Sequence, residues 1–198
     1  MAYLQENIDQ KLRRGTLVGE REIKLSSIPE LIIHLKSREK VFFSKLKEAA
    51  EILRQTDNLS KQDVGYVMIT RFTRFFTGRN LCGFASVPMF DALIKLADQD
   101  RVKVEQKTLL ASNTLHHVLT VADVAANKVE LIDPTYGQYR PLSYAEKILF
   151  TPFENLESLY PTDGRKHVSI VEGIPRGSKS DYPEIISTAL TSLEQCLL

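Results

Sequence analysis

The stretch that decides the fold is residues 115–138, LHHVLTVADVAANKVELIDPTYGQ. Its segments 115–122 and 128–133 are rich in Val, Leu, Ile and Thr and alternate apolar with polar side chains, which is typical of half-buried β-strands. The short segment that joins them predicts a hairpin. Residues 102–110 and 166–172 have the same character. We therefore expect an antiparallel sheet.

Helical patterns lie on both sides of these strands. Residues 26–55 begin with a capping serine and an early proline and then carry apolar side chains at helical spacing. Residues 62–76, 87–97 and 182–198 also favour helix. The sequence thus predicts an α+β fold in which helices pack on an antiparallel sheet.

The remaining segments read as connections. The Pro, Tyr, Gly and Asp content of residues 134–164 predicts a long surface connection with one helical turn around 143–149, and residues 173–178 read as a linker. The length of 198 residues suits one compact domain. Within it we expect a helical N-terminal extension over 1–60, a catalytic core over 61–175, and a C-terminal linker and helix over 176–198.

Composition excludes several partners. Lys plus Arg number 26 against 25 Asp plus Glu, so the positive excess expected of a nucleic-acid binder is missing. No apolar run reaches the length of a membrane span, and the N-terminus lacks the apolar core of a signal peptide. The two cysteines do not suggest a disulfide framework. We expect a cytoplasmic protein, or one exported without a cleaved signal.

Cys82 is a candidate nucleophile because it stands shortly before the apolar, helix-like segment 87–97, with residues 83–86 between them. A cysteine at a helix N-terminus faces unpaired N–H groups and the positive end of the helix dipole, and both lower the thiol pKa. Pro88 implies either a kink or a helix that begins nearer Ser86. The alternative interpretation of Cys82 is a buried structural cysteine.

The adjacent residues His116 and His117 open the predicted strand, and its alternation separates them. His117 lies on the more apolar face, and Asp133 lies on the apolar face of the next strand. If both apolar faces meet the core, His117 and Asp133 point the same way. A hairpin turn centred on Ala125 places these two residues directly opposite each other, whereas a turn one residue different favours His116.

The order Cys, His, Asp, together with LIDPTYGQ at 131–138, resembles the transglutaminase-like branch of the papain-fold cysteine enzymes. The resemblance covers about residues 75–140. It implies a nucleophile helix packed on an antiparallel sheet, with Cys82 as nucleophile, His117 as general base and then acid, and Asp133 as the orienting carboxylate. Bacterial toxins and effectors of this superfamily are similar in size and organisation.

The chain departs from that pattern at two landmarks. Leu119 stands where many members carry Trp, and Phe76 stands where papain-like relatives carry the glutamine of the oxyanion hole. The backbone N–H of Cys82 is then the first oxyanion donor, and Asn80 or Asn113 are candidates for the second. Asn80 also suits a turn or helix cap.

The other polar residues near the motifs have simpler interpretations. Tyr136 and Gln138 can line the site, although a packed loop explains them equally well. His34 and His167 lack a carboxylate partner and are expected to be structural. No spacing suits a metal, and no glycine-rich loop suits a cofactor.

These residues predict a cysteine-dependent hydrolase or acyl transferase that acts on peptide or glutamine carboxamide groups of proteins through a thioester. Water as acceptor makes it a protease or a glutamine deamidase. The alternatives are a protein-crosslinking transglutaminase, an acyltransferase that takes a thioester donor, and a catalytically silent papain-fold binding module.

Overall fold

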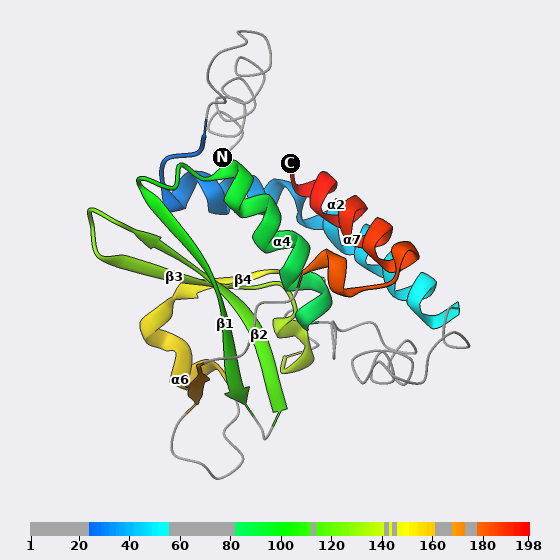
Figure 1. Ribbon diagram of the computed structural model, residues 1–198. Coiled ribbons are helices and arrows are strands. Elements are labelled where there is room, and N and C mark those ends of the chain that lie inside the picture. The colour runs from blue at the N-terminus through cyan, green and yellow to red at the C-terminus, as the bar shows by residue number, and fades with distance from the viewer. Residues whose placement is uncertain are drawn as a thin grey trace, which may run out of the picture.

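A computed structural model describes residues 24–55, 82–111, 114–140, 143, 146–160, 168–172 and 178–198. The long helices are α2 (Ile28–Gln55), α4 (Cys82–Leu96) and α7 (Glu184–Leu197) (Figure 1). The short helices are η1 (Tyr136–Gln138), η2 (Phe153–Asn155), α6 (Leu156–Leu159) and η3 (Lys179–Asp181). The strands are β1 (Val102–Ala111), β2 (Thr114–Asp123), β3 (Lys128–Asp133), β4 (Leu149–Pro152) and β5 (Ser169–Val171).

The five strands form one sheet in the order β4-β3-β2-β1-β5, and every neighbouring pair is antiparallel. The central strands β1 and β2 pair over their whole length, from Val102 opposite Asp123 to Ala111 opposite Thr114. The predicted α+β class and the antiparallel sheet are confirmed.

Both faces of the sheet are buried, each against a different core. Helices α2, α4 and α7 gather over one face, where Leu119, Val121 and Ile132 enter the larger apolar cluster (Figure 1). The opposite face carries a smaller cluster that includes Val118 and Leu131 and is covered by α6 and the neighbouring loops. Successive side chains of β2 therefore enter two separate cores.

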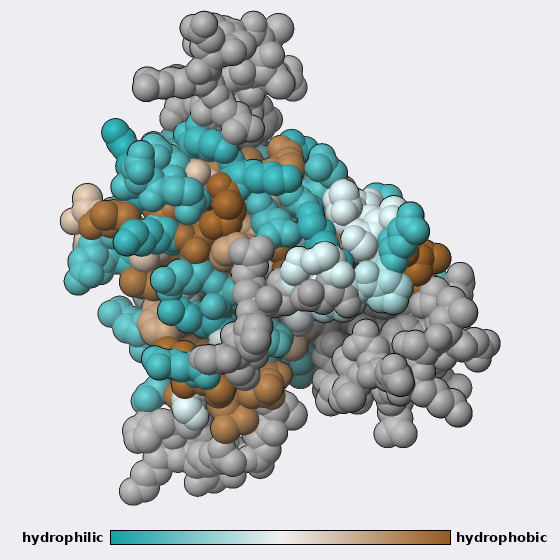
Figure 2. Space-filling view, viewed as in Figure 1, coloured by the Kyte–Doolittle hydropathy of each residue, from teal (hydrophilic) through white to brown (hydrophobic). Residues whose placement is uncertain are grey.

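Helix α2 begins at a capping arrangement close to the one predicted. The Ser27 hydroxyl accepts a hydrogen bond from the Glu30 N–H at 3.4 Å, and the Glu30 carboxylate accepts one from the Ser26 N–H at 2.9 Å. The helix runs without interruption for 28 residues. No helix in the described part of the chain is both long and apolar enough to cross a membrane. The face shown in Figure 2 is largely hydrophilic, with scattered hydrophobic areas.

Helix α4 begins at Cys82, so the start near Ser86 that Pro88 suggested is not observed. Pro88 lies inside the helix and cannot donate to the carbonyl four residues earlier. Most side chains from Phe84 to Leu96 are nonetheless buried against the sheet and α7. Tertiary packing of this apolar helix outweighs the missing backbone hydrogen bond.

The expectation of a long surface connection over 134–164 is wrong in part. Residues 149–152 form β4 because this short apolar segment extends the sheet along β3, where Leu131 lies opposite Thr151. The helical turn expected around 143–149 ends in that strand, and Lys147 and Ile148 are not helical. The predicted helix 62–76 and most of the linker 173–178 lie outside the described residues.

Truncation of Leu193 tests whether α7 belongs to the main core. This side chain is fully buried in the cluster that joins α7 to α2 and α4. We expect Leu193→Ala to lower the free energy of unfolding by about 2 to 5 kcal/mol in urea titrations. Ile185→Ala is the matched control, because Ile185 is 50% exposed on the same helix, and it should change stability by less than about 0.5 kcal/mol. Equal effects of the two variants would contradict the packing described here.

Candidate functional site

The register between β2 and β3 decides which histidine meets Asp133. Thr120 lies opposite Leu131, and Leu119 lies opposite Ile132. Because directly opposed residues share a face, Asp133 shares its face with the even-numbered residues of β2, His116 included. The predicted pairing of His117 with Asp133 is therefore wrong. The turn between β2 and β3 is therefore not the one centred on Ala125. It is displaced from that position, and a displaced turn was the alternative that favoured His116.

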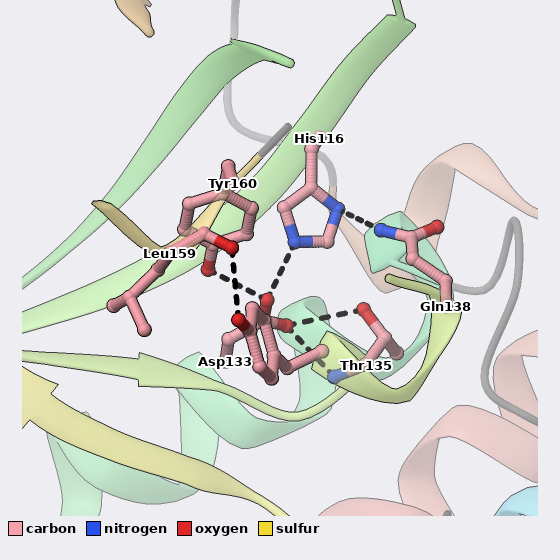
Figure 3. A network of polar contacts seen from close by, with 7 residues as sticks. His116, Asp133, Thr135, Gln138, Leu159 and Tyr160 are labelled. Carbon is pink, nitrogen blue, oxygen red and sulfur yellow. Dashed lines mark hydrogen bonds and ion pairs between the residues drawn. The ribbon is translucent and has the colours of Figure 1, made fainter. Parts of the chain in front are cut away.

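Asp133 ends β3 as a fully buried carboxylate that accepts four hydrogen bonds (Figure 3). Its Oδ2 lies 2.7 Å from Nε2 of His116 and accepts the hydroxyl of Tyr160 at 2.7 Å. Its Oδ1 accepts the backbone N–H of Thr135 at 2.8 Å and the Thr135 hydroxyl at 3.2 Å. A buried charge of this kind is tolerable because its lone pairs are occupied and a cation stands beside it.

His116 is fully buried between this carboxylate and a group of tyrosines. The Tyr139 ring meets the imidazole edge-to-face at 5.2 Å between centroids, and the Tyr160 ring lies at 5.5 Å. Tyr136 packs against both tyrosines and donates its hydroxyl to the Leu159 carbonyl at 2.8 Å, which ties the loop after β3 to α6. The imidazole is thereby held in one orientation.

Cys82 lies at the first residue of α4 and is partly exposed. Its thiol hydrogen-bonds the His116 side chain and also the backbone N–H of His117. Nε2 of His116 faces Asp133, so proton exchange with the thiol would involve Nδ1, the ring nitrogen that Gln138 also approaches. The side chains of Cys82, His116 and Asp133 are therefore connected in series, from a half-buried residue at the start of α4 to a fully buried carboxylate.

The charges in this series favour a thiolate. Burial raises the pKa of the Cys82 thiol, but the hydrogen bond and positive charge of His116 and the N–H of His117 outweigh it, so the pKa lies below its ordinary value. Burial likewise opposes the charged form of His116, yet the Asp133 carboxylate and the Cys82 sulfur raise the pKa of His116 to about 10. A thiolate beside an imidazolium is the resting state that these shifts support.

Gln138 approaches His116 at Nδ1, the same ring nitrogen that is assigned to proton exchange with the thiol. Its Nε2 lies 2.5 Å from Nδ1 of His116 (Figure 3). The amide N–H can donate to Nδ1 when the ring is neutral, and the amide oxygen can accept from Nδ1 when the ring is protonated. Gln138 can therefore support His116 in both protonation states.

His117 points to the opposite face of the sheet, toward α4. Its Nδ1 lies 3.1 Å from the hydroxyl of Thr108, the residue directly opposite it on β1. Burial and the positive charge of His116 hold the pKa of His117 below its ordinary value. His117 contacts the thiol through its backbone, while its imidazole lies away from Asp133.

The other predicted site residues have mixed outcomes. Asn80, Asn113 and His167 lie outside the described residues. His34 is fully buried, and its Nε2 lies 2.6 Å from the carbonyl oxygen of Leu197, which joins α2 to the end of α7. Gln138 proves to contact the site, whereas Tyr136 packs in the loop below it.

Sequence reasoning did not predict Thr135 and Tyr160 as partners of Asp133. The contact of Thr135 could have been predicted from the sequence, because a threonine two residues after an aspartate commonly donates its N–H and hydroxyl to that carboxylate. The contact of Tyr160 with Asp133 could not have been predicted in this way, because it depends on how η2 and α6 fold back over β3.

In the described part of the chain, no group of three or more His, Cys, Asp and Glu side chains is arranged to hold a metal ion. Comparisons of the chain with models of protein families, with curated proteins and with solved structures found no match.

Imidazole titrations by ¹H–¹⁵N NMR test the assigned electrostatics. We expect His116 to stay protonated through neutral pH and to lose its proton only near pH 10, and His117 to be neutral at neutral pH. Asp133→Asn removes the stabilising charge and should bring the His116 midpoint down toward or below 6.5. Spectra of His116→Ala and His117→Ala assign the signals. A native His116 midpoint near 6.5 would refute the assigned ion pair.

Proposed function

We propose that this protein is a cysteine-dependent hydrolase or acyl transferase that acts on carboxamide groups, either peptide bonds or glutamine side chains of proteins. The observation that carries the proposal is the connected series Cys82, His116 and Asp133 at the N-terminus of α4. It supplies a nucleophile, a proton carrier and an orienting carboxylate.

In the first half-reaction the Cys82 thiolate attacks the carbonyl carbon, a C–S bond forms, and the carbonyl oxygen becomes an oxyanion. His116 gives its Nδ1 proton to the leaving nitrogen, the C–N bond breaks, and an amine or ammonia departs. The acyl group remains on sulfur as a thioester. His116 is then neutral, with a lone pair on Nδ1.

In the second half-reaction this lone pair takes a proton from the acceptor, a water or an amine, as the acceptor attacks the thioester carbon. The C–S bond breaks, and the thiolate and imidazolium are restored. Asp133 orients the ring in both half-reactions, because its Oδ2 lies 2.7 Å from Nε2 of His116, and hydrogen bonds from Tyr160 and Thr135 hold the carboxylate in place.

The N-terminus of α4 stabilises the negative charge that develops on the carbonyl oxygen during attack. The first N–H groups of a helix have no intrahelical acceptor, and the helix dipole favours negative charge there. The backbone N–H of Cys82 points to this end of the helix and supports the predicted first oxyanion donor.

The resemblance of the segment 131–138 to the transglutaminase-like branch supports a carboxamide rather than an ester or phosphate substrate. Hydrolysis is the simplest outcome, because water is the most abundant acceptor. Transfer to a lysine amine, as in a crosslinking transglutaminase, uses the same residues and differs only in the acceptor.

Alkylation by iodoacetamide at about pH 7, followed by peptide mass spectrometry, tests the thiolate. We expect Cys82 to react faster than Cys196, whose pKa burial raises to about 11. His116→Ala should slow Cys82 by roughly tenfold or more, because the thiolate loses its counter-ion. His117→Ala is the matched control and should leave the rate within about twofold, since its neutral side chain adds no charge. Equal effects of the two variants would remove the basis of the proposal.

Product analysis tests the reaction class. A glutamine-containing peptide and unfolded casein are incubated with native protein and with Cys82→Ala, with and without an added primary amine. Peptide cleavage, conversion of Gln to Glu, or an amine adduct that depends on Cys82 supports the proposal and identifies the acceptor. Identical spectra for the two proteins with every substrate would count against an acyl-transfer enzyme.

A further inference from the structure

The imidazole of His117 lies beside the nucleophile without belonging to the proton relay. A Cβ atom added to Gly83 would stand 3.5 Å from Cδ2 and 4.0 Å from Nε2 of His117. The edge of the ring that carries Nε2 therefore packs against the backbone of the residue that follows Cys82.

Thr108 holds the ring from the opposite side. Its hydroxyl lies 3.1 Å from Nδ1 of His117, and Thr108 is itself buried on β1. When the hydroxyl donates to Nδ1, the ring proton is on Nε2. Among the described residues, Nε2 of His117 has no hydrogen-bond partner, and the side chain is only partly buried. The ring thus offers an N–H donor beside the nucleophile.

The ring is also suited to donate without giving up a proton. Its burial and the neighbouring imidazolium of His116 favour the neutral form. A neutral imidazole is a weak acid, so it hydrogen-bonds an oxyanion and does not transfer a proton to it. His116 favours the protonated form instead, and it carries out the proton transfer. The two adjacent histidines have environments that separate these tasks.

We propose that the Nε2–H of His117 is the second oxyanion donor, contacting the carbonyl oxygen of the acyl group attached to Cys82. Thr108 is its positioning residue, and Gly83 leaves room for the ring beside the nucleophile. The inference rests on the proposed acyl-transfer function. It assigns the donor for which Asn80 and Asn113 were candidates from sequence.

Two reagents separate oxyanion stabilisation from thiolate formation. Iodoacetamide reacts by displacement at a saturated carbon and forms no oxyanion, whereas p-nitrophenyl acetate acylates through a tetrahedral oxyanion. We expect His117→Ala to slow acylation of Cys82 by roughly 100-fold, the usual effect of losing one oxyanion donor. Alkylation should stay within about twofold of native, because the thiolate keeps His116.

Variants of graded donor capacity sharpen the test. His117→Gln retains a side-chain N–H and should recover part of the acylation rate, whereas His117→Leu should not. Thr108→Val loses the hydroxyl that fixes the tautomer and should give an intermediate loss of acylation with unchanged alkylation. Far-ultraviolet circular dichroism and thermal unfolding confirm that each variant is folded, and the Gln and Leu pair replaces Ala if that variant unfolds.

The outcomes distinguish this inference from the proposed function. If the His117 variants lower both rates equally, or neither rate, His117 is not an oxyanion donor even though Cys82 reacts through His116. If native Cys82 shows no His116-dependent reactivity toward iodoacetamide, the proposed function itself fails, and the inference fails with it.

Discussion

The buried contact between Asp133 and His116 is the interaction on which the site depends. At 2.7 Å from Nε2, with both residues fully shielded from solvent, the carboxylate keeps the imidazole charged, and the charged imidazole lowers the pKa of the Cys82 thiol. Thr135, Tyr160 and the loop after β3 complete the hydrogen bonds of the carboxylate. Without these partners a buried charge would be too costly to retain.

The two adjacent histidines acquire different chemistry because the sheet is buried on both faces. Alternation along β2 sends His116 to the face of Val118 and Leu131, where the carboxylate and the tyrosines lie. It sends His117 to the face of α4, where Thr108 and Gly83 surround a neutral ring. One strand thereby places two adjacent imidazoles in separate environments close to the start of α4.

Much of the framework could be predicted from residues alone. The alternating strands, the capped helix at Ser27 and the cysteine at a helix start are local signals, and they led to the observed elements. Strand parity selected the wrong histidine because it assumed one buried face, whereas both faces are apolar. Tyr160 and strand β4 depend on contacts between segments far apart in the chain, and such contacts leave no periodic signal in the sequence.

The most direct measurement is the pH dependence of the thiolate absorbance of Cys82, taken as the ultraviolet difference between native protein and Cys82→Ser. We expect the pKa of the Cys82 thiol to lie below 9.0, the ordinary value of a cysteine, and to rise in His116→Ala but not in His117→Ala. A native titration near 9.0 that neither substitution changes would contradict the ion pair between Cys82 and His116.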